Sequence, residues 1–537
     1  MARERQVYDY LAAAKAIGYL MILLGTIIMV PLSMLLFYPE EQYQAPYFIV
    51  PGVVSILAGY LVKLFTAPYR IRSLRKHAGS VVVLLIWIVA IFIGCFPFFL
   101  SGDYTFTQSI FEATSGFTTT GFTVTDVDNA THMILLYRSM LHLVGGVGLI
   151  LVLTTILSGV YGMQLFSAEG HTDRLAPSPL NTARSILLIY MGFIIGGTLC
   201  FIRFGMTPFD AFNYAISAVA TGGFATESSS IGYYHSAFID LTAVVLMILG
   251  ATNFMASMYF LKGKFRGYFR HVEVEAYAFL LAIVSPIAVT QLLASKICVS
   301  IPSAIDNGVF QVVSILTTTG LSTVDNYLPR AGYALLPLVL LMMVGGHSDS
   351  TAGGIKAYRF ALAFKSLRWD VMENIFPNRQ IRAREISRFG KKDPVTRDMQ
   401  TQNYSYILIY LLILCAGAFG LTLCGYDIKE AFVEFTSCLG TVGMSIGLVG
   451  RETGTVALWI FIIGMIIARL EVYIILLGIA RIGMDAGIQV NRARLALGIV
   501  RHREFGNRAI NRYTIRKFLK KKLQRKPKER SDDHEQP

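Results

Sequence analysis

Four short segments rich in threonine and glycine recur along this chain, each between an amphipathic stretch and a long apolar one. They read TTTGFTV (118–124), ATGGFAT (220–226), TTTGLST (317–323) and GTVGMSI (440–446). They centre on glycines that stand roughly one hundred residues apart, which indicates a repeated unit, namely Gly121, Gly223, Gly320 and Gly443. In channels, rings of backbone carbonyls replace the hydration shell of an alkali cation. We therefore expect the four loops to build one ring.

The composition is that of a protein embedded in a membrane. Of the 537 residues, 54% are hydrophobic and only 15% are charged, whereas about a quarter of a soluble domain is charged. An apolar run of about 20 residues is long enough to span the hydrocarbon of a bilayer. The sequence predicts ten such spans, at 16–37, 47–66, 79–100, 132–158, 184–204, 238–261, 275–295, 333–364, 404–424 and 455–482.

The net charge of +14 is distributed in a way that indicates topology. Basic residues cluster after the second, sixth, eighth and tenth spans, within Arg70–Lys76, Lys262–Arg270, Arg368–Lys392 and the tail 486–537. The alternate connections carry acidic residues, namely Glu40, Glu41, Asp103, Asp126, Asp128, Asp210, Asp306 and Asp325. The positive-inside rule then places the basic loops and both termini in the cytoplasm. The expected partner of this charge is anionic membrane lipid, and no nucleic acid is expected.

A short amphipathic segment precedes each Thr/Gly loop, at 106–117, 208–220, 304–316 and 427–439. Each has about 12 residues, which is too few to cross a bilayer. Asp or Thr near the start of at least three is typical of a helix N-terminus. Each fits a re-entrant half-helix that returns as an extended loop, a structure tolerated only beside a watery cavity. A single TxG fragment would reflect chance or helix packing, but four in the same context predict a pore.

Longer motifs accompany the loops: ATSGFTTTGFTV (113–124), RSMLHLVGGVGLI (138–150), GATNF (250–254), GGHSDSTAGGIK (345–356) and ARLEVY (468–473). With these motifs, nearly the whole chain resembles the Trk/Ktr/HKT superfamily of potassium uptake proteins, and most of all the bacterial and archaeal Trk-type pore subunit. The resemblance implies gated potassium uptake by a homodimer in the plasma (inner) membrane of a prokaryote. It also implies a cytosolic nucleotide-binding regulatory ring (RCK/TrkA-like), with potassium as the bound ion and no organic cofactor in this chain.

The resemblance further implies which residues would bind potassium through a selectivity filter. They are Thr119, Thr120, Gly121 and Phe122 in the first loop, Thr221, Gly222, Gly223 and Phe224 in the second, Thr318, Thr319, Gly320 and Leu321 in the third, and Thr441, Val442, Gly443 and Met444 in the fourth. The fourth loop looks closer to the Ktr pattern, so a Ktr-like sodium-dependent potassium transporter is the alternative within the superfamily.

The expected fold is an all-α polytopic membrane protein with four tandem helix–pore-loop–helix repeats around a pseudo-fourfold pore, after an N-terminal transmembrane hairpin. The expected divisions are the hairpin at 1–70, pore repeats at 71–165, 175–270 and 271–370 (the third with an intramembrane gate loop), a cytoplasmic loop at 371–402, the fourth pore repeat at 403–485 and a basic cytoplasmic tail at 486–537.

The segment GGHSDSTAGG interrupts the eighth expected span with residues that suit no lipid-facing helix. It resembles the family's intramembrane gate loop beneath the filter, and a glycine kink for packing is the alternative. The gating residues implied are Gly345, Gly346, Ser348, Asp349, Ser350, Thr351, Gly353, Gly354 and Arg469. His347 and Asp349 depart from the small residues expected there, and they would tune gating or pH response, or hydrogen-bond the loop.

Arg469 lies deep in the last span, where a charge is costly and usually faces a cavity or a partner. The resemblance places it in the ion path as an electrostatic barrier. The alternative is a structural ion pair, although Glu471, two residues further on, lies on a different helix face.

The sequence offers no catalytic motif, because it has no GxxxxGK[ST] phosphate loop, no HExxH and no nucleophile–base set. A secondary carrier would typically show inverted repeats, whereas these four repeats run in one direction. The sequence therefore favours a pore over a carrier or a membrane enzyme.

Overall fold

The structure is a computed structural model that describes residues 2–69, 78–156, 179–375, 384–470 and 472–496. The chain divides into two compact units, Met1–Ile479 and Ala480–Pro537. The first unit contains all four loops. Of the second, the structure describes the later part of α22 (Val472–Ala496), where Arg481 pairs with Asp485 at 3.6 Å. Several predicted features lie outside the described residues, namely the basic cluster at 70–76, Glu471 and the tail beyond 496.

The helices follow the order expected for four repeats. The first comprises α3 (Ala78–Gly94), α4 (Phe96–Ser101), α5 (Phe106–Thr118), α6 (His132–Val147) and α7 (Leu149–Ile156). The second comprises α9 (Pro179–Arg203), α10 (Pro208–Val219), η3 (Ser230–Tyr234), α11 (Ala237–Ala251), α12 (Phe254–Leu261) and α13 (Phe265–Phe269). The third comprises α14 (Val272–Ala294), α15 (Ile301–Leu316), α16 (Tyr327–Arg330), η4 (Gly332–Ala334), α17 (Leu335–Val344) and α18 (Ala357–Ile375). The fourth comprises α19 (Arg397–Leu423), α20 (Ile428–Gly440) and α21 (Thr455–Arg469).

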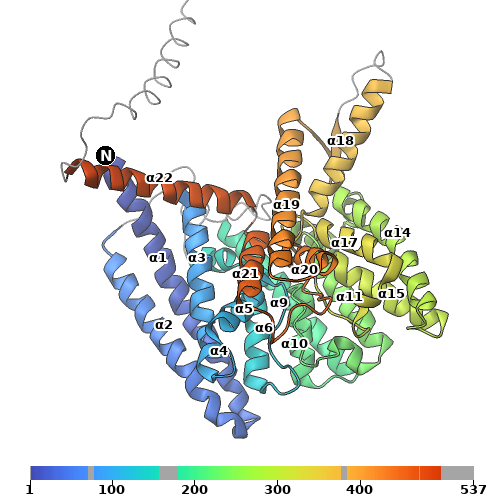
Figure 1. The fold of residues 1–537 in the computed structure, drawn as a ribbon, viewed down its shortest axis with the longest axis horizontal. Helices are drawn as coiled ribbons and strands as arrows, with labels where there is room; N and C mark the ends of the chain where they lie inside the picture. The colour runs from blue at the N-terminus through green and yellow to red at the C-terminus, as the bar shows by residue number, and fades with distance from the viewer. Residues whose placement is uncertain (1, 70–77, 157–178, 376–383, 471, 497–537) are drawn as a thin grey trace, which may run out of the picture. The chain divides into compact units, whose positions relative to one another are not determined.

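The expected N-terminal hairpin is present. It consists of α1 (Ala2–Met29), η1 (Val30–Leu36), η2 (Pro39–Gln44) and α2 (Ala45–Thr66). The two long helices lie side by side, and α1 also packs on α3 (Figure 1). Their backbones approach closely because glycines face each other, so a Cβ on Gly25 would lie 2.6 Å from the carbonyl oxygen of Gly52.

The four short amphipathic segments fold as the helices α5, α10, α15 and α20, hereafter the pore helices. Each begins at a residue whose side chain accepts a hydrogen bond from a backbone N–H of the first turn, and these caps are Thr105, Thr207, Ser300 and Asp427. A cap of this kind stabilises a helix by about 1 kcal/mol. The local sequence therefore fixes where each pore helix begins.

The repeats are arranged in a cycle. Each pore helix packs against the first helix of its own repeat. It also packs against the helix that follows the loop of the preceding repeat, and these contacts between repeats pair α10 with α6, α15 with α11, α20 with α17, and α5 with α21. Because the last pair joins the first repeat to the fourth, the four repeats close into a cycle.

The expectation of ten spans, of which only the eighth is interrupted, is wrong for other helices that follow the loops. Among the described residues, six helices are long and apolar enough to cross a membrane, or eight if each of two bent pairs is one span. The expected span 132–158 breaks at Gly148, whose φ is 96°. The span 238–261 bends by 118° where Asn253 caps α12. Apolar composition carries no trace of these breaks, because single capping or glycine residues cause them.

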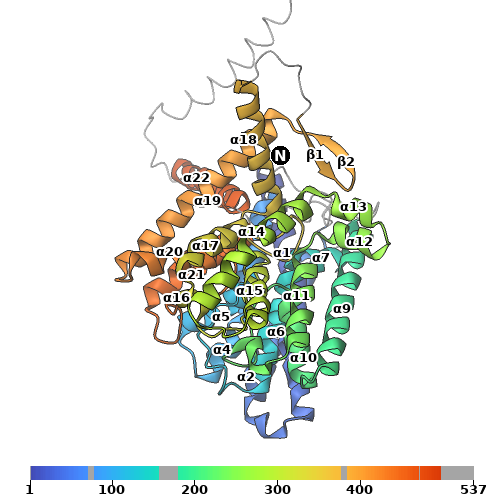
Figure 2. The same cartoon turned by 90° about the vertical axis from the view of Figure 1, so that its right-hand side faces the viewer.

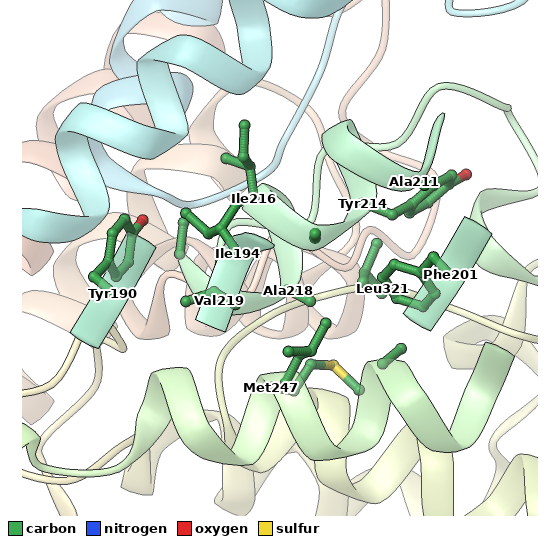
Figure 3. Close-up of a cluster of buried hydrophobic side chains, with 14 of the residues drawn as sticks. Tyr190, Ile194, Phe201, Ala211, Tyr214, Ile216, Ala218, Val219, Met247 and Leu321 are labelled. Carbon is green, nitrogen blue, oxygen red and sulfur yellow. The ribbon is translucent and has the colours of Figure 1, made fainter. Parts of the chain in front are cut away.

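A buried apolar cluster joins the second repeat to the third loop. Most of its side chains come from α9, α10 and α11, others come from α6 and α15, and Leu321 contributes from the loop after α15. Figure 3 shows Tyr190, Ile194 and Phe201 of α9 beside the α10 residues and Leu321. The pore helix α10 is thus packed tightly against its neighbouring helices, and this packing gives the second loop a rigid support.

The region 371–402, which we expect to be a cytoplasmic loop, includes regular secondary structure. It contains the end of α18 and an antiparallel hairpin of β1 (Glu385–Arg388) and β2 (Lys391–Pro394), which lies beside α18 (Figure 2). Ile386 and Val395 pack with Leu362 of α18. At the hairpin's tip, the ring of Phe389 stacks on Tyr259 at 4.8 Å between centroids. The alternation of strand residues is too short to stand out from the surrounding charges.

Candidate functional site

The four Thr/Gly loops meet so that each central glycine packs against the backbone of the next loop. A Cβ placed on any of these glycines would lie 1.9–2.2 Å from a carbonyl oxygen. In order around the ring, the pairs are Gly121 with Gly222, Gly223 with Thr319, Gly320 with Val442, and Gly443 with Thr120. Because the fourth loop returns to the first, the four loops form one closed ring.

The backbone takes the same unusual course in all four loops. A threonine two residues before each central glycine has a φ between 51° and 55°, at Thr119, Thr221, Thr318 and Thr441. The glycines themselves have φ between 75° and 89°. A left-handed threonine is uncommon and costs about 1–3 kcal/mol, and such strain is found mostly at functional sites. In each loop, one residue whose φ lies outside the left-handed region separates the left-handed threonine from the left-handed glycine.

Every residue expected in the filter lies on this ring. The threonines among them are completely buried. The side chains of Phe122, Phe224, Leu321 and Met444, which follow the glycines, are buried in the surrounding protein. Only the backbone of these four residues is therefore available to an ion on the axis.

Sequence reasoning missed the side chains that hold each loop from behind. Glu112 of α5 accepts hydrogen bonds from the Thr123 hydroxyl at 2.8 Å and the Val124 N–H at 3.0 Å. Glu434 of α20 likewise accepts from the Ser445 hydroxyl and from the N–H groups of Ile446 and Val449. In the third repeat, the Gln311 amide bonds the Ser322 hydroxyl at 2.7 Å.

The three anchors, Glu112, Gln311 and Glu434, each lie nine residues before the central glycine of their repeat. Each forms a hydrogen bond with the hydroxyl group of the residue two positions after that glycine. The fixed offset is visible in the sequence and could have identified them. The second repeat departs from the pattern, since it has Tyr214 and Ala225 at these positions. Its loop must therefore be held in another way.

The second loop is held by α6 of the first repeat. Arg138 forms a buried ion pair with Glu112 at 2.9 Å and donates to the Ala225 carbonyl at 3.2 Å. Its guanidinium lies 4.0 Å from the ring centroid of Phe224. The ring of His142, one turn further along α6, stacks on Phe224 at 4.1 Å. Phe224 is thus clamped by two side chains from another repeat.

The segment Gly345–Lys356, hereafter the gate loop, lies directly against one face of the ring. The Thr351 hydroxyl is 3.0 Å from that of Thr221 and donates to the Gly250 carbonyl at 2.9 Å. The Gly353 N–H donates to the Thr318 hydroxyl at 2.9 Å. A Cβ on Gly353 would lie 2.0 Å from Oγ1 of Thr441. The gate loop therefore contacts the left-handed threonine of three of the four loops, namely Thr221, Thr318 and Thr441.

Arg469 ties the gate loop to the first repeat. Its guanidinium donates to the Thr351 carbonyl at 2.7 Å and to the carbonyls of Gly145 and Gly146 at the end of α6. The two glycine carbonyls lie at the carboxyl end of α6, where the helix dipole favours a cation. The structure thus brings Arg469 and the expected gate residues together. The alternative ion pair with Glu471 lies outside the described residues.

His347 and Asp349 occupy different surroundings. The His347 ring is buried, with its centroid 4.4 Å from that of Tyr277, and its Nδ1 lies 4.0 Å from Oε2 of Glu273. Glu273 accepts a hydrogen bond from the Ser348 N–H at 2.8 Å. Asp349 has a φ of 53° and borders a cavity. Both residues therefore belong to the packing that shapes the gate loop.

Cavities lie on both sides of the ring. One of about 610 Å³ is lined by the four central glycines together with Asp126, Glu227 and Asp325. Another of about 400 Å³ lies on the gate-loop side and is lined by Lys356, Arg359, Arg388 and Arg469. Among the described lining residues, the first cavity has three carboxylates and one cation, Arg138, whereas the second has four cations and one carboxylate, Asp349. A cation would meet an attractive field on one side of the ring and a repulsive one on the other.

Glu227, which lines the acidic cavity, has a raised pKa. Partial burial, together with the carboxylates of Asp210 and Asp128, raises the pKa of Glu227 above its usual value. Each of these causes disfavours the ionised form. Glu227 therefore takes up a proton at a higher pH than an isolated glutamate.

Known proteins resemble the chain over most of its length. A Trk system potassium uptake protein TrkH from Halomonas elongata is 30% identical over 86% of this chain and 96% of its own. TrkG, a Trk system potassium uptake protein from Escherichia coli, is 30% identical over 85% and 95%. An uncharacterized cation transporter of Methanocaldococcus jannaschii is 28% identical over 85% and 92%.

A crystal structure of the potassium transporter TrkH from Vibrio parahaemolyticus superposes with a TM-score of 0.76 at 27% identity, over 87% of this chain and 98% of that one. The family model TrkH, described as a cation transport protein, matches residues 48–485. The match includes all four loops, the gate loop and Arg469. The chain is a multi-pass membrane protein that belongs to the TrkH family of cation transport proteins.

Proposed function

We propose that the chain conducts potassium into the cell through the ring of four loops, as the pore subunit of a Trk-type uptake system. The observation that carries this proposal is the cyclic packing of Gly121, Gly223, Gly320 and Gly443, each against a carbonyl of the next loop. A ring fixed in this way holds its carbonyls at a set distance from the axis, and such carbonyls substitute for the hydration shell of the ion.

In this proposal, the ion-binding groups are the backbone carbonyls of the filter residues named above. The carboxyl ends of the pore helices point partial negative charge at the axis and add to the attraction. The anchors Glu112, Gln311 and Glu434 keep each returning strand in place. The fourth loop differs from the others, so dependence on sodium, as in a Ktr-like transporter, is the alternative that the experiment below addresses.

The gate loop and Arg469 would close the pathway in the conformation described. Thr351 and Gly353 bond hydroxyls of the ring, and Arg469 fixes Thr351 while it presents a positive charge to the path. The same contacts argue against a simple packing kink, because a kink would not need polar bonds to two separate loops and close packing on a third. Opening would require these bonds to break together.

The proposed orientation follows the charges. The acidic cavity would face outward and collect cations, while the cationic cavity, the β-hairpin and both termini would face the cytoplasm. The proposed partners are a second copy of this chain and a cytosolic nucleotide-binding assembly, and the support for both is the similarity to the named Trk proteins. The nucleotide-binding assembly would act on the gate loop from the cytoplasmic side.

Flux into proteoliposomes tests this function. Rubidium-86 uptake should saturate with rubidium and be competed by potassium far better than by sodium. Uptake should proceed without an imposed sodium gradient if the pathway is a simple pore. Strict dependence on sodium would favour the Ktr-like alternative, and equal competition by sodium and potassium would contradict the proposal.

A further inference from the structure

The residue directly before the central glycine carries a side chain in three loops but is itself a glycine in the second loop. Thr120, Thr319 and Val442 carry β-branched side chains, and all three are completely buried. The hydroxyls of Thr120 and Thr319 bond those of Thr118 and Thr317, at 2.8 and 2.9 Å. The second loop has Gly222 at this position and so lacks the side chain that backs the ring elsewhere.

The backbone does not require a glycine at position 222. Its φ lies outside the left-handed region that excludes side chains, unlike the φ of Gly223. The obstacle is instead another side chain, because a Cβ on Gly222 would lie 2.4 Å from Nδ1 of His142 and 2.5 Å from its Cε1. The space behind Gly222 is therefore filled by the imidazole.

His142 is held there by packing. Its exposed fraction is 0%, and its ring is nearly parallel to that of Phe224, with 16° between the planes. Among the described residues, neither of its ring nitrogens has a hydrogen-bond partner. Buried polar atoms are normally hydrogen-bonded, so the surrounding protein offers this imidazole packing contacts in place of polar ones. The role of His142 therefore lies in the shape of its ring and in the contacts of that ring with Gly222 and Phe224.

We propose that His142 determines the ion selectivity of the second loop by replacing, from a different repeat, the side chain that Gly222 lacks. The proposal rests on the potassium function proposed above. The ring of His142 presses on Gly222 and Phe224, which flank the central Gly223, and so sets how far the loop can retreat from the axis. Removing the ring leaves a void into which the loop relaxes, because a void gives its lining atoms no contacts.

A histidine that served only the core would behave differently. Its loss would lower stability, but it would leave the discrimination between ions unchanged and would not depend on residue 222. Two measurements therefore distinguish a role in selectivity from a role in core packing alone. They are the ratio of sodium to rubidium uptake and the energetic coupling between substitutions at positions 142 and 222.

The test is a mutant cycle in proteoliposomes that measures this ratio and the melting temperature. His142→Ala should raise the sodium-to-rubidium ratio about tenfold, a change of about 1.4 kcal/mol. Gly222→Val, which copies the residue of the fourth loop, should reduce rubidium uptake strongly because its side chain meets the imidazole. The double variant should recover both uptake and selectivity, since the valine fills the vacated space.

Leu136→Ala is the matched control, because Leu136 is a buried residue of α6 that packs in the apolar cluster of the second repeat. It should lower the melting temperature and leave the ion ratio unchanged. The proposal is overturned if His142→Ala keeps wild-type selectivity, if the double variant is no better than the worse single variant, or if Leu136→Ala alters the ratio equally. Failure of the wild-type protein to prefer rubidium would instead refute the proposed function.

Discussion

The carbonyl oxygen of Thr120 packs so closely on Gly443 that a Cβ at Gly443 would lie 1.9 Å from it. This contact joins the first and fourth loops, which are the most distant in sequence, and it closes the ring. Each loop consequently rests on two neighbours, so a change in one loop alters the positions of the others. The ring should respond to substitutions as a unit.

Replacing Gly443 by alanine should disrupt this closure. The Cβ would meet the Thr120 carbonyl, and the backbone at φ 75° disfavours any side chain. We expect the potassium affinity and the preference over sodium to fall at least about tenfold, which corresponds to about 1.4 kcal/mol. Competition of rubidium-86 uptake by potassium and sodium measures both. Gly450→Ala is the control, since its Cβ would meet nothing within 4 Å, and an equal loss there would contradict the prediction.

Replacing Arg469 by glutamine should increase basal flux. The guanidinium donates to the Thr351 carbonyl at 2.7 Å, and in the function proposed above its positive charge lies in the ion path. Removing a barrier of about 1 kcal/mol raises flux about fivefold. The measurement is uptake by protein reconstituted without any partner, with the exposed Arg330→Gln as a charge-matched control. Unchanged flux in a well-folded Arg469 variant would favour a purely structural role.

Adding a methyl group at Gly353 should loosen the gate loop. The Cβ would lie 2.0 Å from Oγ1 of Thr441 and 2.8 Å from the Gly440 carbonyl, although the backbone at Gly353 itself tolerates a side chain. The loop therefore could not seat against the ring, and Gly353→Ala should raise basal flux while selectivity is kept. Flux and the ion ratio are read in the same vesicles. Reduced flux with unaltered protein yield would show that the loop supports the ring rather than closing it.

The outer cavity should make uptake sensitive to external pH. Because the pKa of Glu227 is raised, this carboxylate becomes protonated at a higher pH than an isolated glutamate as the external pH falls. Its negative charge is thereby lost, and uptake at low potassium should decline before the pH reaches the ordinary range of glutamate titration. Glu227→Gln should show the lower uptake already at pH 7 and a flatter pH profile. An unchanged profile in this variant would rule Glu227 out as the sensor.

Much of this site follows from local sequence. The Thr/Gly cores give the loops, and the caps Thr105, Thr207 and Asp427 give the starts of three pore helices, because both depend on a few neighbouring residues. The order of the repeats and the gate segment follow likewise. These features need no knowledge of distant contacts.

The remaining features depend on contacts between distant segments. His142 acts on Gly222 from another repeat, so the doubled glycine of the second loop has no local explanation. The bend at Asn253 depends on one capping side chain inside an apolar run, which hydropathy averages away. Glu112 looks like an ordinary polar residue of an amphipathic helix until Thr123 and Arg138 are seen beside it.

Location of the bound ion tests the central claim most directly. Crystals of the protein grown in rubidium should show anomalous density on the axis of the ring, within reach of the carbonyls of all four loops. Replacing rubidium with sodium should abolish or displace these peaks. Rubidium density found only outside the ring, or against one loop alone, would contradict the account that the four loops form a single potassium-selective filter.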